Sequence, residues 1–319
     1  MTEPIDSGEA NPAPETPIAT PDSALPMWLT NLPDQARPYA ALARLDRPVG
    51  IWLLFLPCLM GLALMRIPEG LRWIDLGWTL LFAIGAVTMR GAGCTWNDIS
   101  DRDVDAEVSR TASRPIPSGQ VTLPQAYMFL AAQLVIGFLV WLFLPVVAKI
   151  VALMAVPLVL IYPYMKRITW WPQAWLGFTF NWGVLVAGAT VYGSVTGASV
   201  VLYLGLAFWT VAYDTAYALQ DVEDDALVGI KSTARLFGDK VLTGILVFHI
   251  AATAWITASA YFAGAGRIGA LIGLGFFAHG FWQISKLNEN RTGNALMVFK
   301  SNVWAGVIVA AGLLIAALI

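Results

Sequence analysis

Acidic side chains gather in two short windows of this sequence. Nine of the 21 acidic residues lie in NDISDRDVDAE (97–107) and DVEDD (221–225), each directly after an apolar segment. Because so many carboxylates in one place repel one another, we expect a positive partner to offset the repulsion. Mg²⁺ prefers oxygen ligands and is commonly held by one or two carboxylates together with substrate phosphates. The two windows therefore predict a magnesium site that binds a diphosphate.

The spacing in the first acidic window (97–107) indicates which residues bind the metal. Asn97, Asp101 and Asp105 recur every four residues, so a continuing helix places them on one face. Asp98 shares this broad face through its neighbours three and seven positions along. We predict that these four side chains are metal ligands and that Asp101 and Asp105 are essential for catalysis.

The second acidic window (221–225) repeats this spacing. Asp221 and Asp225 are four residues apart, and Asp214 and Tyr217 lie on the turns before them. We predict Asp221 and Asp225 as catalytic metal ligands that face the first acidic window, with Tyr217 contacting the substrate. The remaining acids are equally well explained as solvated loop residues, above all Asp103, Glu107 and Glu223.

Basic residues lie next to both windows and in the loop between them: Arg110, Arg114, Lys166, Arg167 and Lys231. Guanidinium and ammonium groups bind diphosphate oxygens and stabilise the negative charge of a departing diphosphate, so we predict that role for all five. For Lys166 and Arg167, anchoring at the membrane surface is the alternative. For Arg235 and Lys240, anchoring is the better interpretation.

The composition indicates where this chemistry takes place. Of the 319 residues, 58% are hydrophobic and only 13% are charged, against about 25% charged in soluble domains. The chain is therefore predicted to be a multi-span membrane protein in contact with a lipid bilayer. The absence of a basic stripe argues against nucleic acid as a partner. Cys58, Cys94, His249 and His279 stand isolated in apolar segments, which favours packing roles over a disulfide or zinc site.

Runs of about 20 apolar residues, enough to cross about 30 Å of hydrocarbon, set the expected architecture. The fold class is all-α, a polytopic bundle of about nine transmembrane helices, with a tight hairpin between the third and fourth. The expected spans are 48–66, 77–96, 123–144, 148–164, 173–192, 199–219, 240–261, 267–285 and 297–318.

The basic residues also predict the orientation of the bundle. Most of the 19 Lys and Arg side chains fall on the side that carries the N-terminus and both acidic windows, while Arg90 lies within a span. Because Lys and Arg concentrate in cytoplasmic loops, that side is predicted to face the cytoplasm. Residues 1–36, rich in Pro and acid, are predicted to be a disordered tail that precedes a transmembrane domain over 37–319.

The chain resembles the UbiA family of intramembrane prenyltransferases, in particular its 4-hydroxybenzoate polyprenyltransferases of ubiquinone synthesis. The most specific segments are GCTWNDISDRDVDAEVSRTASRPIPSG (93–119) and YDTAYALQDVEDDALVGIKSTARLFG (213–238), with support from 45–57 and 162–177. The first matches the family pattern NDxxDxxxD and the second matches DxxxD. Neither motif departs from the family pattern.

This resemblance implies a reaction. Nine helices would surround a central cavity, and two magnesium ions would bridge both motifs to a polyprenyl diphosphate in a bacterial-type inner membrane. The tail of the donor would leave sideways between helices into lipid. The prenyl group would pass to the ring carbon ortho to the hydroxyl of 4-hydroxybenzoate.

Two further residues are predicted to contact the acceptor. Arg47 is the candidate for binding its carboxylate, with anchoring at the membrane surface as the alternative. Asp214 would orient or deprotonate the phenol. Other acceptors of the same reaction stay open, namely dihydroxynaphthoate, homogentisate, heme and chlorophyllide. An ion-coupled transporter is the remote alternative, although transporter sites usually lie near the midplane on broken helices.

Overall fold

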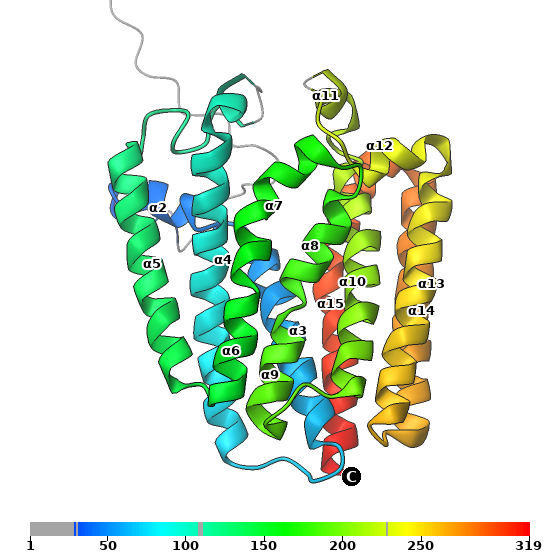
Figure 1. The fold of residues 1–319 in the computed structure, drawn as a ribbon. Helices are drawn as coiled ribbons and strands as arrows, with labels where there is room; N and C mark the ends of the chain where they lie inside the picture. The colour runs from blue at the N-terminus through cyan, green and yellow to red at the C-terminus, as the bar shows by residue number, and fades with distance from the viewer. Residues whose placement is uncertain (1–28, 30, 108–110, 228) are drawn as a thin grey trace, which may run out of the picture.

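The computed structural model describes residues 29, 31–107, 111–227 and 229–319, and the regular secondary structure within them is all helical (Figure 1). The N-terminal tail predicted over 1–36 lies mostly outside the described residues. The helices are α2 (Arg37–Leu42), α3 (Val49–Arg66), α4 (Ile74–Glu107), α5 (Leu123–Phe143), α6 (Val146–Met154), α7 (Val156–Ile168), α8 (Pro172–Phe180), α9 (Gly183–Tyr192), α10 (Gly197–Ala218), α11 (Val222–Leu227), α12 (Thr233–Phe237), α13 (Val241–Phe262), α14 (Gly266–Glu289) and α15 (Arg291–Leu318).

Nine helical segments among the described residues are long and apolar enough to cross a membrane, and each overlaps one predicted span. The largest difference is α4, whose 34 residues correspond to about 51 Å at 1.5 Å per residue. Because the hydrocarbon core is about 30 Å thick, α4 extends beyond it. The first acidic window therefore lies on a rigid continuation of a transmembrane helix. The predicted hairpin between the third and fourth spans is confirmed at Leu144 and Pro145, between α5 and α6.

The fifth span is broken in the middle, between α8 and α9. The side-chain amide of Asn181 donates to the carbonyl oxygens of Gly177 and Leu206 at 2.8 and 3.1 Å and to the hydroxyl of Thr210 at 2.8 Å. Inside a bilayer no water is present to bind the backbone carbonyls that a helix break leaves free, so a side chain must donate hydrogen bonds to them. Asn181 thus stabilises the break and ties it to α10.

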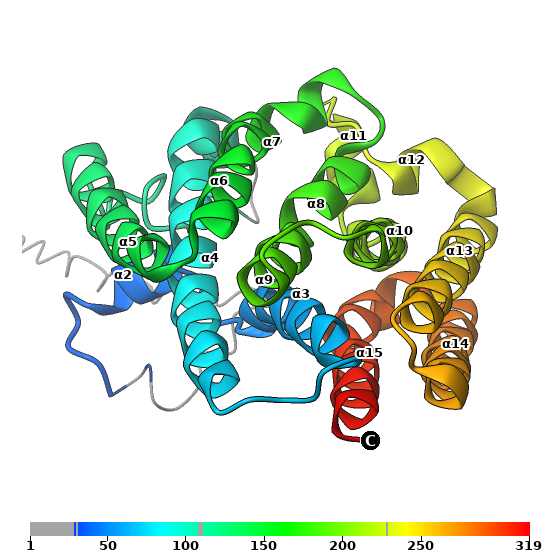
Figure 2. The same ribbon diagram turned by 60° about the horizontal axis from the view of Figure 1, so that its bottom comes forward.

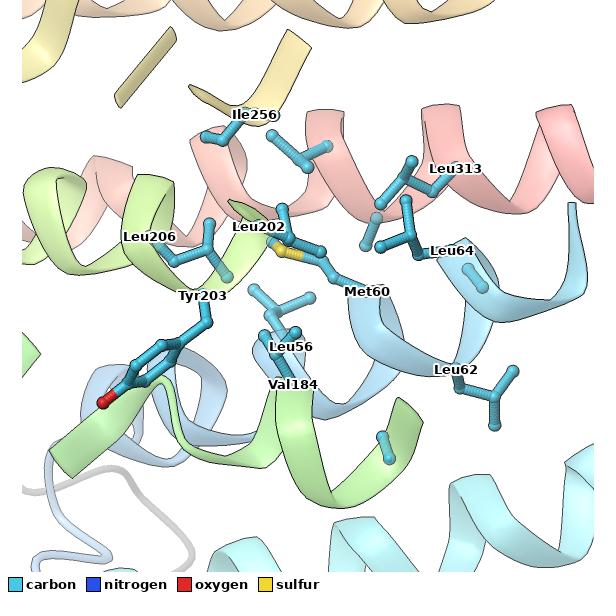
Figure 3. Close-up of a cluster of buried hydrophobic side chains, with 14 of the residues drawn as sticks. Leu56, Met60, Leu62, Leu64, Val184, Leu202, Tyr203, Leu206, Ile256 and Leu313 are labelled. Carbon is cyan, nitrogen blue, oxygen red and sulfur yellow. The ribbon is translucent and has the colours of Figure 1, made fainter. Parts of the chain in front are cut away.

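The core of the bundle forms where α3, α9, α10, α13 and α15 meet (Figure 3). Met60, Leu202, Leu206 and Ile256 are fully buried there. A Cβ atom at Gly61 of α3 would lie 2.4 Å from the carbonyl oxygen of Val184 in α9. Small residues allow such close helix contacts in membranes, so this glycine is required by packing.

Both acidic windows lie at one end of the bundle, opposite the C-terminus. Figure 1 shows the upper ends of α4 and α7 together with α11 and α12 at this end, while the C-terminus lies at the other. In the turned view, α4 and α5 lie on one side of the bundle and α13 and α14 on the other (Figure 2). The helices therefore bring together two windows that are more than one hundred residues apart in sequence.

A buried ion pair closes the opposite end of the bundle, where α3 connects to α4. Nε and Nη2 of Arg66 donate to the two carboxylate oxygens of Asp75 at 2.8 and 2.7 Å, and both residues are only 4% exposed. The backbone N–H of Arg72 donates to the same carboxylate at 2.7 Å. These bonds fix the connection between the two helices.

Replacing Asp75 with Ala is expected to lower the free energy of unfolding by about 3–5 kcal/mol, because the buried guanidinium of Arg66 loses its two short bonds and keeps only the longer contact with Glu69, at 3.5 Å. Titration of the micelle-solubilised protein with SDS measures the change. The control is Glu289→Ala, which breaks the exposed pair between Glu289 and Lys286 and should cost less than about 1 kcal/mol. Equal losses in the two variants would show that the buried pair contributes no more than an exposed one.

Candidate active site

Asp98 is fully buried and is held by two arginines. Nη2 of Arg44 donates to both of its carboxylate oxygens at 2.7 and 2.9 Å, and Nη1 of Arg114 approaches Oδ1 at 3.4 Å. Among the described residues, Arg44 is the one non-glycine residue with a positive φ, 56°. Such a backbone conformation is costly outside glycine and persists where surrounding contacts hold it. The pair with Asp98 is such a contact and joins the segment after α2 to α4.

Asp101 and Asp105 are also buried and paired with cations. Nζ of Lys166 and Nη2 of Arg167, at the end of α7, contact the two oxygens of Asp101 at 2.5 and 2.9 Å. Arg114 donates to Asp105 at 2.6 Å. Burial raises the pKa of Asp105, and this outweighs the opposing effect of Arg114. Three of the five cations predicted to bind a diphosphate thus lie in direct contact with carboxylates predicted to bind its metal.

The second acidic window lies directly after α10, in line with the expected span over 199–219. Asp214 and Tyr217 lie on α10, which ends at Ala218, and α11 starts at Val222. Asp221 and Asp225 are still joined by a helical turn, since the N–H of Asp225 donates to the carbonyl of Asp221 at 2.8 Å. Asp221 therefore lies on the turn between the two helices.

Arg235 binds the backbone of the segment that follows Asp221. Its Nη1 donates to the backbone carbonyls of Asp225, at 3.2 Å, and Ile230. Its guanidinium lies over the ring of Trp170, 5.4 Å from the centroid. Surface anchoring of Arg235 stays a prediction, and these contacts show that its side chain also holds the segment at the end of the second acidic window.

A small cavity of about 220 Å³ lies between the two windows. Its wall is largely polar and combines oxygen ligands with basic groups. The polar lining residues are Asn97, Asp105, Thr111, Arg114, Tyr162, Lys166, Gln173, Asp214, Asp221, Asp224, Asp225, Lys231 and Ser232. Both predicted acidic windows therefore face one space, together with three of the predicted basic residues.

A large cavity of about 1040 Å³ adjoins the small one and extends into the apolar bundle. Most of its wall consists of apolar side chains of α3 to α10. The residues that line both cavities are Asn97, Arg114, Tyr162, Lys166, Pro172, Asp214 and Asp221. This arrangement suits a ligand with a strongly charged end and a long apolar body, with the chemistry at the junction.

Comparison with known proteins identifies this architecture. Residues 54–306 match the sequence profile of the UbiA prenyltransferase family. The chain belongs to this family. It is 44% identical over 291 residues to the mitochondrial 4-hydroxybenzoate polyprenyltransferase of Aedes aegypti, covering 88% of this chain and 64% of that protein. It is 41% identical to 4-hydroxybenzoate geranyltransferase 2 of Lithospermum erythrorhizon, covering 91% of this chain and 94% of that protein.

Solved structures of UbiA homologues share the fold. The apo structure from Aeropyrum pernix K1 is 25% identical, with a TM-score of 0.68, and covers 82% of this chain and 97% of that one. The structure from Archaeoglobus fulgidus bound to GPP and Mg²⁺ is 16% identical, with a TM-score of 0.63, and covers 88% of this chain and all of that one. The helical membrane bundle predicted from the sequence is therefore confirmed.

The remaining predicted site residues of this UbiA protein are distributed over both cavities. Lys231 lines the small cavity, where its backbone N–H donates to the carbonyl of Lys166 at 2.9 Å. Arg47 and Tyr217 line the large cavity, and Arg47 also pairs with Asp46 at 3.0 Å. Arg110 lies outside the described residues. Within the described part of the chain, Asp101 and Arg167 are not among the residues that line either cavity.

Two residues of this site were missed by sequence reasoning. Arg90, in the middle of the α4 span, lines the large cavity with its guanidinium over the ring of Phe180, 5.2 Å from the centroid. Its buried Nε has no hydrogen-bond partner among the described residues. Tyr162 lines both cavities beside Asp214. The sequence held a signal for Arg90, because a charged residue inside an apolar span usually has a functional role.

Proposed function

We propose that this protein transfers a polyprenyl group from a polyprenyl diphosphate to the ring carbon ortho to the hydroxyl of 4-hydroxybenzoate, in ubiquinone biosynthesis. The observation that carries the proposal is the shared wall of the two cavities. The small polar cavity suits a diphosphate and the large apolar cavity suits a polyprenyl chain. Their junction is where the bond between the two parts of such a donor would lie.

The relatives support the acceptor and the reaction class. Both relatives named above act on 4-hydroxybenzoate by their names, and both match about nine tenths of this chain. They differ in the named donor, since one is a polyprenyltransferase and the other a geranyltransferase. Similarity to these relatives therefore supports 4-hydroxybenzoate as the acceptor more strongly than it supports any particular chain length of the donor.

The side chains present fit magnesium. The small cavity offers the amide of Asn97 and the carboxylates of Asp105, Asp221 and Asp225, all oxygen ligands of the kind that Mg²⁺ binds. We propose these residues as its ligands, with Asp98 and Asp101 as the other predicted members. Bound Mg²⁺ would polarise the diphosphate as a Lewis acid and lower the energy of its developing charge.

Basic side chains of the small cavity would help the donor to dissociate. As the allylic carbon–oxygen bond breaks, negative charge grows on the diphosphate and a delocalised carbocation remains. Lys166, Lys231 and Arg114 face the space where that charge develops, and fixed cations in a dry site stabilise it more strongly than water does. The apolar wall of the large cavity excludes water that would otherwise trap the carbocation as an alcohol.

We propose that Arg90 binds the carboxylate of the acceptor, in place of or together with Arg47. Arg90 is a cation in an apolar cavity whose buried Nε has no partner in the described structure, and a guanidinium matches a carboxylate in geometry and charge. Asp214, at the junction of the cavities, would orient the phenol and accept the proton that is lost after the ring carbon attacks. Tyr162 lines the same junction.

The product of the purified protein tests this function. With geranyl diphosphate, 4-hydroxybenzoate and Mg²⁺, mass spectrometry is expected to detect 4-hydroxybenzoate carrying one geranyl group in place of a ring hydrogen. Chelation of Mg²⁺ with EDTA should abolish the product, and excess Mg²⁺ should restore it. A panel with dihydroxynaphthoate and homogentisate identifies the acceptor. Prenylation of another acceptor in preference to 4-hydroxybenzoate would contradict the assignment.

We also propose that the end of the bundle with the acidic windows faces the cytoplasm of a bacterial-type inner membrane. Lys166 and Arg167 lie in the last turn of α7, Lys231 precedes α12 and Arg235 lies within α12, all at this end. Few basic residues lie at the opposite end. Labelling of single cysteines from either side of sealed vesicles tests the orientation.

A further inference from the structure

The large cavity follows one side of α4 for most of the width of the bilayer. Lining residues on this helix run from Asn97, at the junction with the small cavity, back to Leu81. These 16 residue steps correspond to about 24 Å at 1.5 Å per residue. An apolar chain that starts at the junction can therefore lie along α4.

The opposite wall of this part of the cavity is open to lipid. Leu134 and Phe138 of α5 and Leu160 of α7 line the cavity, yet they are 48%, 54% and 48% exposed. Figure 1 shows α5 separated from α7 above the hairpin that joins α5 to α6. A chain lying along α4 would thus have the bilayer beside it.

Two glycines of α4 leave room in this part of the cavity. A Cβ atom at Gly93 would meet no atom within 4 Å, and one at Gly85 would meet only Val140, at 3.5 Å, an ordinary contact. Neither glycine has a positive φ. Glycine costs about 1 kcal/mol relative to alanine inside a helix, and close helix packing does not require it here, in contrast to Gly61. Gly85 and Gly93 therefore leave space on the α4 side of the large cavity.

Building on the proposed function, we propose that Gly93 and Gly85 determine which polyprenyl donors fit along α4. Gly93 lies one turn, about 6 Å, from Asn97, and Gly85 lies about 18 Å from it. Three bonds of an extended chain span 3.80 Å, so the four bonds of one isoprene unit span roughly 5 Å. A geranyl tail, with two units, ends before Gly85, whereas a tail of four or more units passes it.

The test is Gly85→Leu, assayed with 4-hydroxybenzoate and either geranyl diphosphate or a donor of eight isoprene units. The added side chain points into the cavity beyond the reach of a geranyl tail. We expect kcat/KM for the long donor to fall about tenfold or more, the effect of a few methylene groups in an apolar pocket, while kcat/KM for geranyl diphosphate stays within about twofold. Gly93→Leu, near the junction, should lower both.

Gly77→Leu is the matched control. Gly77 lies on the same helix, is exposed and does not line the cavity in the described structure, and a Cβ atom there would meet nothing within 4 Å. This substitution should leave the ratio between the two donors unchanged. If Gly85→Leu fails to fold, Val140→Phe fills the same region from α5 and should give the same selective loss.

An equal change for both donors, or no change, in Gly85→Leu and Val140→Phe would overturn the inference. Failure of the proposed function would look different, because the unmodified protein would then prenylate 4-hydroxybenzoate with neither donor. The two hypotheses are therefore separable within one set of assays.

Discussion

Replacing Asp221 with Ala is expected to lower kcat/KM for prenyl transfer by about 10²–10³-fold, the usual effect of removing one group that stabilises transition-state charge. Asp221 lines both cavities, which is the junction where the diphosphate and the prenyl carbon would separate in the proposed reaction. The substitution keeps the backbone bond between Asp221 and Asp225. Membrane abundance and the thermal stability of the purified protein should therefore stay close to those of the unmodified chain.

Glu223→Ala is the control for Asp221→Ala. Glu223 is exposed on α11, two residues away, and does not line either cavity in the described structure. Glu223→Ala removes the same charge from the same end of the bundle. It therefore distinguishes the loss of a group at the site from a general change in the charge of this end. Activity of Asp221→Ala within threefold of Glu223→Ala would refute a direct role for Asp221.

Asp101→Ala is predicted to abolish transfer, and the reason differs from that for Asp221→Ala. Asp101 is 1% exposed and contacts Lys166 and Arg167. Its loss would leave two cations at the end of α7 without this carboxylate, and Lys166 faces both cavities. Because the variant would change the position of Lys166 as well as a possible metal ligand, it reports less directly on metal binding than Asp221→Ala does.

The spans and the position of the acidic windows could be predicted because they depend on local properties of the sequence. Apolar length predicts a spanning helix whatever its neighbours are, and a spacing of four places Asn97, Asp101 and Asp105 on one side of α4. The end of α10 at Ala218 falls one residue before the end of the expected span, whereas the short turn that leads into a separate helix, α11, could not be predicted in this way. Local hydrogen bonds and tertiary contacts, including the bonds from Arg235 to the segment after Asp221, accompany that turn.

Pairings between distant residues were also beyond the sequence. The contacts of Asp98 with Arg44 and of Asp101 with Lys166 join positions 54 and 65 residues apart. Spacing rules give the face of a helix but not which helix packs against it. For the same reason, the sequence placed Arg90 within a span but did not show that α3 and α8 enclose it with an apolar cavity.

Replacing Arg90 with Gln is expected to lower kcat/KM for 4-hydroxybenzoate by roughly 10²–10³-fold. Truncating one partner of a buried charged hydrogen bond costs about 2–5 kcal/mol, and about 1.36 kcal/mol corresponds to tenfold. The loss should be specific to the acceptor, because Arg90 lines only the large cavity and not the small cavity proposed for the diphosphate. Binding of geranyl diphosphate, measured by calorimetry with Mg²⁺, should change less than threefold.

An uncharged acceptor decides between Arg90 and Arg47. The unmodified enzyme should prefer 4-hydroxybenzoate over 4-hydroxybenzamide, since only the former pairs with a fixed cation. If Arg90 binds the carboxylate, Arg90→Gln abolishes this preference and Arg47→Gln keeps it, because the guanidinium of Arg47 already pairs with Asp46. The reverse pattern would assign the carboxylate to Arg47, and an unchanged preference in both variants would show that neither arginine recognises it. A cation inside an apolar span is costly, and a preference that depends on Arg90 would explain why this span contains one.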